Sequence, residues 1–150
     1  MLSLTRTTSD HPDFRTLVTL LDHDLAVRDG GEHAFYAQLN KAAVLRHVVL
    51  AYLDGEAVGC GAFREHAAGE VEVKRMFVPP AHRGQGVAGK VLAELEAWAR
   101  ELGYTACVLE TGKKQPEAIR LYEKSGYVYI PNYGQYAGVT NSVCLRKVVG

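Results

Sequence analysis

The stretch Arg83-Gly84-Gln85-Gly86-Val87-Ala88-Gly89-Lys90 places three glycines within six residues, between two cationic side chains. It follows the apolar run 76–78 and a Pro79-Pro80 turn, and it opens an amphipathic helix pattern. A glycine-rich turn that begins a helix directs several backbone N–H groups at one point, where the helix dipole adds positive potential. The stretch therefore predicts a cradle for an anion, with a pyrophosphate as the expected ligand. The alternative is a turn that only packs a helix against a strand.

The strand expected before this stretch, over 70–78, loses its alternation partway along. Val71 and Val73 alternate with charged residues, whereas Lys74 and Arg75 are both polar and the next three residues are all apolar. A slip in a period-two pattern indicates a β-bulge, which separates neighbouring strands and often lies beside a binding site.

The rest of the chain alternates between strand and helix patterns. Strands are expected over 2–7, 48–53, 57–64, 105–110, 127–130 and 141–147, and helices over 13–25, 32–41, 87–102 and 116–125. The Asp54-Gly55 pair between two strand patterns predicts a hairpin. The strand, helix and strand around the glycine stretch predict a right-handed parallel crossover. The pattern is that of an α/β domain with a mixed sheet.

Length and composition indicate one globular domain, residues 1–150, in the cytoplasm. Lysine plus arginine and aspartate plus glutamate are both 17, so the net charge is zero and nucleic acid is not expected as a partner. No apolar run approaches the roughly 20 residues of a membrane span, and the N-terminus lacks the apolar core of a signal peptide. The three cysteines show no metal-ligand spacing and are expected to be buried, reduced thiols.

Two motifs in the correct order resemble the GNAT superfamily of acyl-CoA-dependent N-acetyltransferases. Arg83, Gly86 and Ala88 match the acetyl-CoA signature Arg/Gln-x-x-Gly-x-Gly/Ala, and 118–127 (AIRLYEKSGY) matches A-x-x-L-Y-x-K-x-G-F/Y. The element order fits over essentially the whole chain. The resemblance implies a mixed, mostly antiparallel sheet of about seven strands, with a central splayed parallel pair and about four helices.

The resemblance also implies acetyl-CoA as co-substrate and no metal. The backbone N–H groups of 85–89 are expected to hold the pyrophosphate, and Met76 and Val78 to pair with the pantetheine arm. Gln115 stands where many members have Asn, which makes its contact a departure from the pattern. The expected cofactor-binding residues are Met76, Phe77, Val78, Arg83, Gly84, Gln85, Gly86, Val87, Ala88, Gly89, Lys90 and Gln115.

Two side chains resemble the catalytic residues of the family. An alkyl ammonium has a pKa near ~10.4, so the acceptor amine must lose a proton before it attacks. Glu72 resembles the family's base; the alternative is an exposed strand carboxylate. Tyr122 resembles the general acid, although proton transfer from a phenol near ~10 to a thiolate near ~8.5 is uphill by roughly 2 kcal/mol. Tyr122 is therefore expected mainly to hydrogen-bond the sulfur, with core packing as the alternative.

The acceptor is expected to be a small primary amine, of a metabolite or an amino acid, that attacks directly in a ternary complex. The candidate acceptor-binding residues are His33, Tyr36, Arg64, Lys74, Asn132, Tyr133 and Tyr136. The aromatic loop 131–138 could instead cover the core or join a homodimer interface. Two other functions stay open: acetylation of a protein N-terminus or lysine, and non-catalytic sensing of acyl-CoA. A P-loop nucleotide site fits poorly, because Val91 follows Gly89-Lys90.

Overall fold

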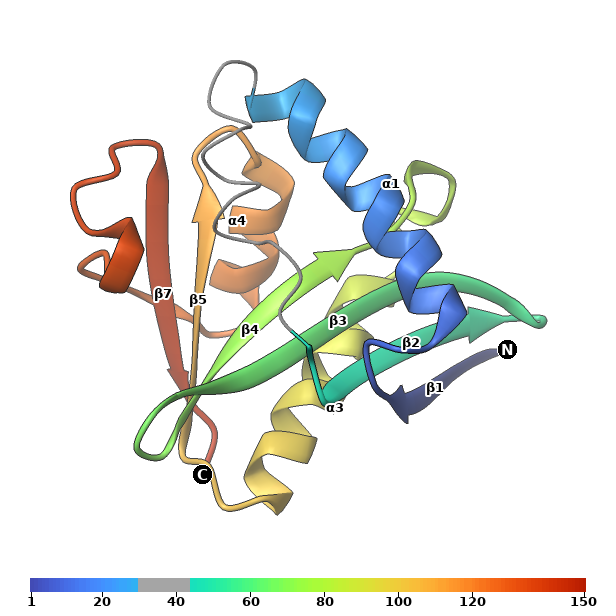
Figure 1. The fold of residues 1–150 in the computed structure, drawn as a ribbon, viewed down its shortest axis with the longest axis horizontal. Helices are drawn as coiled ribbons and strands as arrows, with labels where there is room; N and C mark the ends of the chain where they lie inside the picture. The colour runs from blue at the N-terminus through green and yellow to red at the C-terminus, as the bar shows by residue number, and fades with distance from the viewer. Residues whose placement is uncertain (30–43) are drawn as a thin grey trace.

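A computed structural model describes residues 1–29 and 44–150, which form one sheet covered by helices on both faces (Figure 1). The sheet runs in the order β1-β2-β3-β4-β5-β7-β6. The strands are β1 (Leu2–Thr7), β2 (His47–Leu53), β3 (Glu56–Ala67), β4 (Glu70–Phe77), β5 (Ala106–Gly112), β6 (Val128–Ile130) and β7 (Ser142–Val148). The helices are α1 (Pro12–Asp29), α3 (Val87–Glu101) and α4 (Pro116–Lys124), with 3₁₀ turns at Pro80–His82 and Gly134–Tyr136. The helix expected over 32–41 lies outside the described residues.

The expected parallel pair is β4 with β5, and the other neighbouring strands pair antiparallel. The parallel register begins at Glu70 opposite Ala106 and ends at Glu72 opposite Val108. Beyond that point β4 continues to Phe77 and β5 to Gly112 as diverging strands. The mixed sheet with its splayed parallel pair is thus confirmed.

The expected bulge is also confirmed and lies at Arg75. Cys60 of β3 pairs with Phe77, but two residues later Ala62 pairs with Lys74, so β4 contains one extra residue. Arg75 takes a positive φ of 60°, and its carbonyl accepts a hydrogen bond from the Cys60 thiol at 3.3 Å. The bulge interrupts the β3–β4 ladder between Lys74 and Phe77, a few residues beyond Glu72, the last residue of β4 that pairs with β5.

Helix α1 covers one face of the sheet, whereas α3 and α4 cover the other (Figure 1). Phe14, Leu17 and Leu21 of α1 form a core with apolar residues of β2 and β3. The larger core joins α3 and α4 to the opposite face. On this face position 61 requires glycine, because a Cβ there would overlap Met76 and lie 2.9 Å from Leu95. Helix α3 therefore packs closely on the sheet, with its first turn at the end of β4.

Candidate active site

The glycine stretch forms a tight turn into the N-terminus of α3. Gly84 and Gly86 have φ values of 79° and 80°, in the left-handed region that favours glycine. Lys90 donates its N–H to the Gly86 carbonyl at 3.2 Å, whereas the first three N–H groups of a helix have no intrahelical acceptor. A Cβ built on Gly84, Gly86 or Gly89 would meet no heavy atom within 4 Å. The turn thus presents backbone donors to open space, which fits a pyrophosphate group.

Arg83 connects this turn to the end of β4. Its Nε donates to the Val78 carbonyl at 2.8 Å, and its guanidinium lies 5.8 Å from the centre of the Phe77 ring. A further guanidinium nitrogen lies 3.7 Å from Asp24 of α1. The Arg83 side chain therefore fixes the position of the turn relative to the strand. It also lines a cavity beside the turn, described next.

Two cavities meet at the point where β4 and β5 diverge. The first, of about 290 Å³, lies against the glycine turn and α4. The second, of about 90 Å³, lies between the diverging strands. Both are lined by Leu21, Met76, Gln115, Ala118 and Tyr122. A molecule that extends from the glycine turn through the first cavity would therefore reach the second beside Met76 and Tyr122.

Most of the predicted cofactor-binding residues line the first cavity. They are Met76, Phe77, Val78, Arg83, Gly84, Gly86, Val87, Ala88, Gly89 and Gln115. Gln85 and Lys90 are not among its lining residues. Gln115 is the residue before α4, its side chain does not cap that helix, and it lines both cavities.

Glu72 lies in the second cavity, and its side chain is almost completely buried (3% exposed). Arg64 donates from Nε to one carboxylate oxygen at 3.1 Å, and the Tyr133 hydroxyl donates to the other at 2.7 Å. The alternative of an exposed strand carboxylate is wrong, because Glu72 points into the cavity. Arg64 faces Glu72 across the β3–β4 hairpin, whereas Tyr133 comes from the loop 131–138, 61 positions after Glu72.

Lys74 also faces the second cavity, with 8% of its side chain exposed. Its Nζ lies 3.9 Å from the Glu72 carboxylate. Burial lowers the pKa of Lys74, while the charge of Glu72 acts in the opposite direction. The ammonium group of Lys74 has therefore lost part of its hydration at this position.

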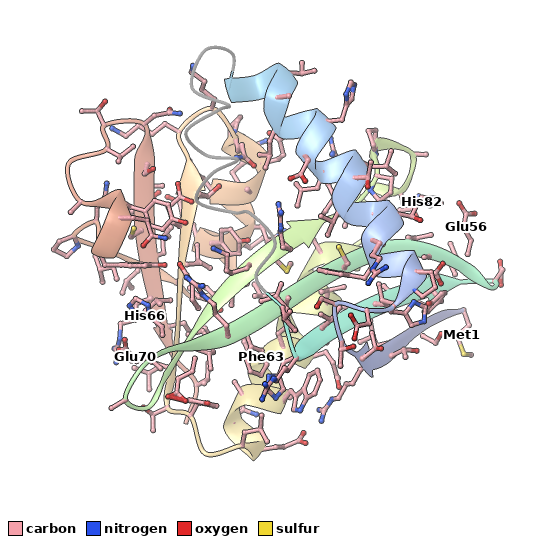
Figure 2. All side chains as sticks on the ribbon, in the orientation of Figure 1. Met1, Glu56, Phe63, His66, Glu70 and His82 are labelled. Atoms are coloured by element: carbon pink, nitrogen blue, oxygen red, sulfur yellow. The ribbon has the colours of Figure 1, made fainter. Side chains whose placement is uncertain are left out.

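The aromatic loop 131–138 completes this part of the site. The centre of the Tyr133 ring lies 5.8 Å from that of Tyr136 and 4.6 Å from that of His66. His66 lies near the end of β3 and is labelled in Figure 2. Tyr136 is buried and lines the second cavity. The Asn132 amide instead donates to the carbonyls of Val139 and Ser142, at 3.1 and 3.0 Å. Asn132 thus shapes the loop.

Tyr122 lies where the two cavities join. Burial, and then the charge of Glu110, raise the pKa of its phenol, which consequently stays protonated. Its ring packs edge to face against Tyr127 at 5.6 Å. The Tyr127 hydroxyl in turn donates to the buried Glu96 carboxylate at 2.9 Å. These contacts hold the ring of Tyr122 in one position beside the cavity.

The structure adds Glu110 to the site, a residue that the sequence reasoning missed. Glu110 lines the second cavity from β5, and its carboxylate accepts a hydrogen bond from the Ser142 hydroxyl at 2.8 Å. Its signal in the sequence was its place near the end of a strand that pairs in parallel, where ligands commonly bind. His33 and Tyr36, two further predicted acceptor residues, lie outside the described residues.

Within residues 1–29 and 44–150, no cluster of three or more metal-ligating side chains occurs, and no helix is long and apolar enough to cross a membrane. All three cysteines are free and buried. Burial raises the pKa of the Cys60 thiol to about 12 and that of Cys107 to about 11. A thiol that is protonated and buried is a poor nucleophile.

Comparison with known proteins shows that other acyltransferases share this fold. An acyl-CoA N-acyltransferase described from Klebsiella pneumoniae superposes with a TM-score of 0.83 at 32% identity, covering 100% of this chain and 99% of that one. The paiA N-acetyltransferase of Thermoplasma acidophilum, in complex with coenzyme A, shares the fold with a TM-score of 0.73 at 14% identity, covering 99% of both chains.

Relatives of known sequence match a shorter part of the chain. The IAA acetyltransferase of Azospirillum brasilense is 38% identical over 100 residues, which are 66% of this chain and 65% of that relative. The profile of the Acetyltransferase (GNAT) family matches residues 13–127. This chain therefore belongs to the GNAT acetyltransferase family.

Proposed function

We propose that the protein is an N-acetyltransferase that moves an acetyl group from acetyl-CoA to the primary amine of a small metabolite or amino acid. The observation that carries the proposal is the junction of the two cavities. One cavity is bordered by backbone donors suited to a pyrophosphate, the other by buried charged side chains, and both open onto Tyr122. This arrangement suits direct attack in a ternary complex, because donor and acceptor can be bound at the same time.

The co-substrate supplies an acetyl thioester. The N–H groups at the start of α3 bind its pyrophosphate, as the open space over Gly84, Gly86 and Gly89 allows. The ladder between β4 and β5 ends at Glu72, where the two strands diverge, so Met76 and Val78 can hydrogen-bond the amide groups of a pantetheine arm. A backbone N–H near Phe77 polarises the thioester carbonyl.

Glu72 serves as the base in this proposal. It accepts the ammonium proton of the acceptor, directly or through water, and so produces the neutral amine that attacks. Arg64 and Tyr133 each donate to a different oxygen of the carboxylate. Both oxygens retain a second lone pair, so these contacts orient the base and leave it able to accept a proton.

Tyr122 stabilises the sulfur that departs. The raised pKa of its phenol makes complete proton transfer to a thiolate less favourable than in water. A hydrogen bond from the phenol to the sulfur needs no such transfer and stabilises developing negative charge in a water-poor site. Tyr122 therefore acts chiefly as a hydrogen-bond donor.

The test is a turnover assay with acetyl-CoA and a panel of amines, read by mass spectrometry of acetylated products and by release of free CoA. We expect saturable acetylation of at least one small amine. Peptides with free N-termini and lysines belong in the same panel. Preferential acetylation of peptides would replace the small-molecule assignment. Binding of acetyl-CoA without any acetylated product would identify a sensor and refute an enzymatic role.

A further inference from the structure

The Lys74 side chain is largely buried, with 8% of it exposed, and the neighbouring carboxylate of Glu72 is already hydrogen-bonded by other groups. Its Nζ lies 3.9 Å from Glu72, beyond hydrogen-bond distance, whereas Arg64 and Tyr133 donate to that carboxylate at 3.1 and 2.7 Å. Burial lowers the pKa of Lys74, as expected for an ammonium removed from water. Buried charges in proteins are normally paired at close range. The described part of the chain thus leaves room for a closer anionic partner of Lys74.

The position of Lys74 separates it from the phosphates of the co-substrate. Lys74 lines the second cavity but not the one beside the glycine turn. An anion beside Lys74 would therefore belong to the acceptor. The charges around it are mixed. Glu72 and Glu110 oppose the lowering of the Lys74 pKa by burial, whereas Arg64 and Arg75 add to it. This arrangement suits a molecule with a cationic and an anionic end.

Size and charge favour a carboxylate over a phosphate. The second cavity has a volume of about 90 Å³, which admits a short substituent. A phosphate dianion would bring two negative charges near Glu72 and Glu110, and like charges at close range are costly. A carboxylate brings one, and the ammonium of Lys74 offsets it with a charge-assisted hydrogen bond.

We infer that Lys74 binds a carboxylate of the acceptor, which makes the acceptor an amino acid or another amine that carries a carboxylate. The inference rests on the proposed acetyl transfer. Lys74 is thereby a specificity-determining residue: it selects among amines, while Glu72 and Tyr122 serve the transfer itself.

The test compares amino acids with their amides, for example alanine with alaninamide and methionine with methioninamide. The readout is the ratio of kcat/KM for acid and amide in each variant, because intrinsic differences in amine reactivity cancel between variants. We expect Lys74→Met to lower this ratio about tenfold to hundredfold, mainly through KM for the acid. Lys74→Arg should restore part of the ratio. Lys124→Met, at an exposed position of α4, is the matched control and should leave it unchanged.

Two results would overturn the inference. One is a wild-type enzyme that acetylates only amines without a carboxylate. The other is a Lys74→Met variant that loses activity equally toward acids and amides with intact acetyl-CoA binding, which would make Lys74 a general support of Glu72.

Failure of the proposed function is distinguishable from failure of this inference. If wild-type protein acetylates neither acids nor amides, calorimetric titration with the same pairs in the presence of CoA judges the carboxylate site alone. Binding of acids to wild type, lost in Lys74→Met, would support the site without catalysis. Equal binding of acids and amides would refute it.

Discussion

Tyr133 donates a hydrogen bond of 2.7 Å to Glu72 across 61 positions of sequence. Burial raises the pKa of Tyr133, so its phenol stays protonated and able to donate at neutral pH. The residue comes from the loop 131–138, whose shape depends on the Asn132 amide. The orientation of the proposed base therefore depends, besides Arg64, on a loop that follows α4 in the sequence.

Replacing Tyr133 by phenylalanine should reduce kcat about tenfold or more, because Glu72 loses one of the two donors that orient its carboxylate. The dissociation constant of acetyl-CoA should not change, since Tyr133 borders neither the glycine turn nor the first cavity. Tyr129→Phe is the matched control, because that hydroxyl bonds Glu123 at the exposed surface. Equal losses in the two variants would contradict a positioning role.

Replacing Glu72 by glutamine should lower turnover by about 10²- to 10⁴-fold and shift its pH profile, as expected when a general base is removed. The measurement is kcat/KM as a function of pH. Glu70→Gln serves as control, because Glu70 lies on the same strand but pairs with Arg146 at 2.9 Å. An unchanged pH profile in the Glu72 variant would exclude Glu72 as the base.

Tyr122→Phe should keep the fold and the affinity for acetyl-CoA but lower kcat, since the ring contact with Tyr127 is retained and only the hydroxyl is lost. Because the pKa of Tyr122 is raised, the wild-type profile should show no loss of activity from its ionisation below pH 9. Steady-state kinetics and calorimetric titration separate the two effects. Wild-type turnover in the variant would refute a role for the phenol.

Gly89→Ala should separate stability from cofactor binding. Gly89 lies in the first turn of α3 without a positive φ, so alanine should stabilise the helix by up to about 1 kcal/mol. The new methyl group would occupy the open space in front of the turn and weaken binding of CoA. Thermal unfolding measures the stability, and calorimetry measures the affinity for CoA.

Gly86→Ala, at a φ of 80°, should lower both the stability and the affinity for CoA. Unimpaired CoA binding in Gly89→Ala would argue against the pyrophosphate site.

Cys60 should make the stability of the protein fall in alkaline solution. Burial raises the pKa of its thiol from 9.0 to about 12 in the folded state, so the unfolded chain loses this proton first. The resulting stabilisation is complete below pH 9 and is lost as the pH rises toward 12, by at most about 1.4 kcal/mol per pH unit. Denaturant unfolding of wild type and Cys60→Ala from pH 8 to 11 should give a shallower decline for the variant. Parallel declines would contradict the assignment.

Local signals in the sequence were sufficient for the fold and for the cradle. The Asp54-Gly55 turn and the loss of alternation at Lys74-Arg75 predicted the hairpin and the bulge, because turn geometry and strand pleat depend on residues near in sequence. The glycines before α3 predicted backbone donors at a helix start for the same reason. The alternation of strands with helices was enough to predict one parallel pair in a mixed sheet.

The arrangement of the second cavity could not be predicted in this way. The sequence marked Glu72, Arg64, Lys74 and Tyr133 as separate candidates. Arg64 faces Glu72 across one hairpin, but nothing local placed Tyr133, 61 positions away, on the same carboxylate. It also passed over Glu110, and it did not show that the Asn132 amide would hold the loop. Such contacts depend on the packing of distant segments, which no local periodicity encodes.

By itself, the sequence determined the elements, the bulge and the glycine turn, since each follows from the conformational preferences of a few adjacent residues. Only the tertiary structure decided what surrounds the reacting groups. The divergence of β4 from β5 opens a cavity, and the loop 131–138 returns to place Tyr133 on Glu72. Burial raises the pKa of the Tyr122 phenol, which therefore stays protonated. The same removal of water disfavours the charged form of Lys74 unless an anion lies beside it.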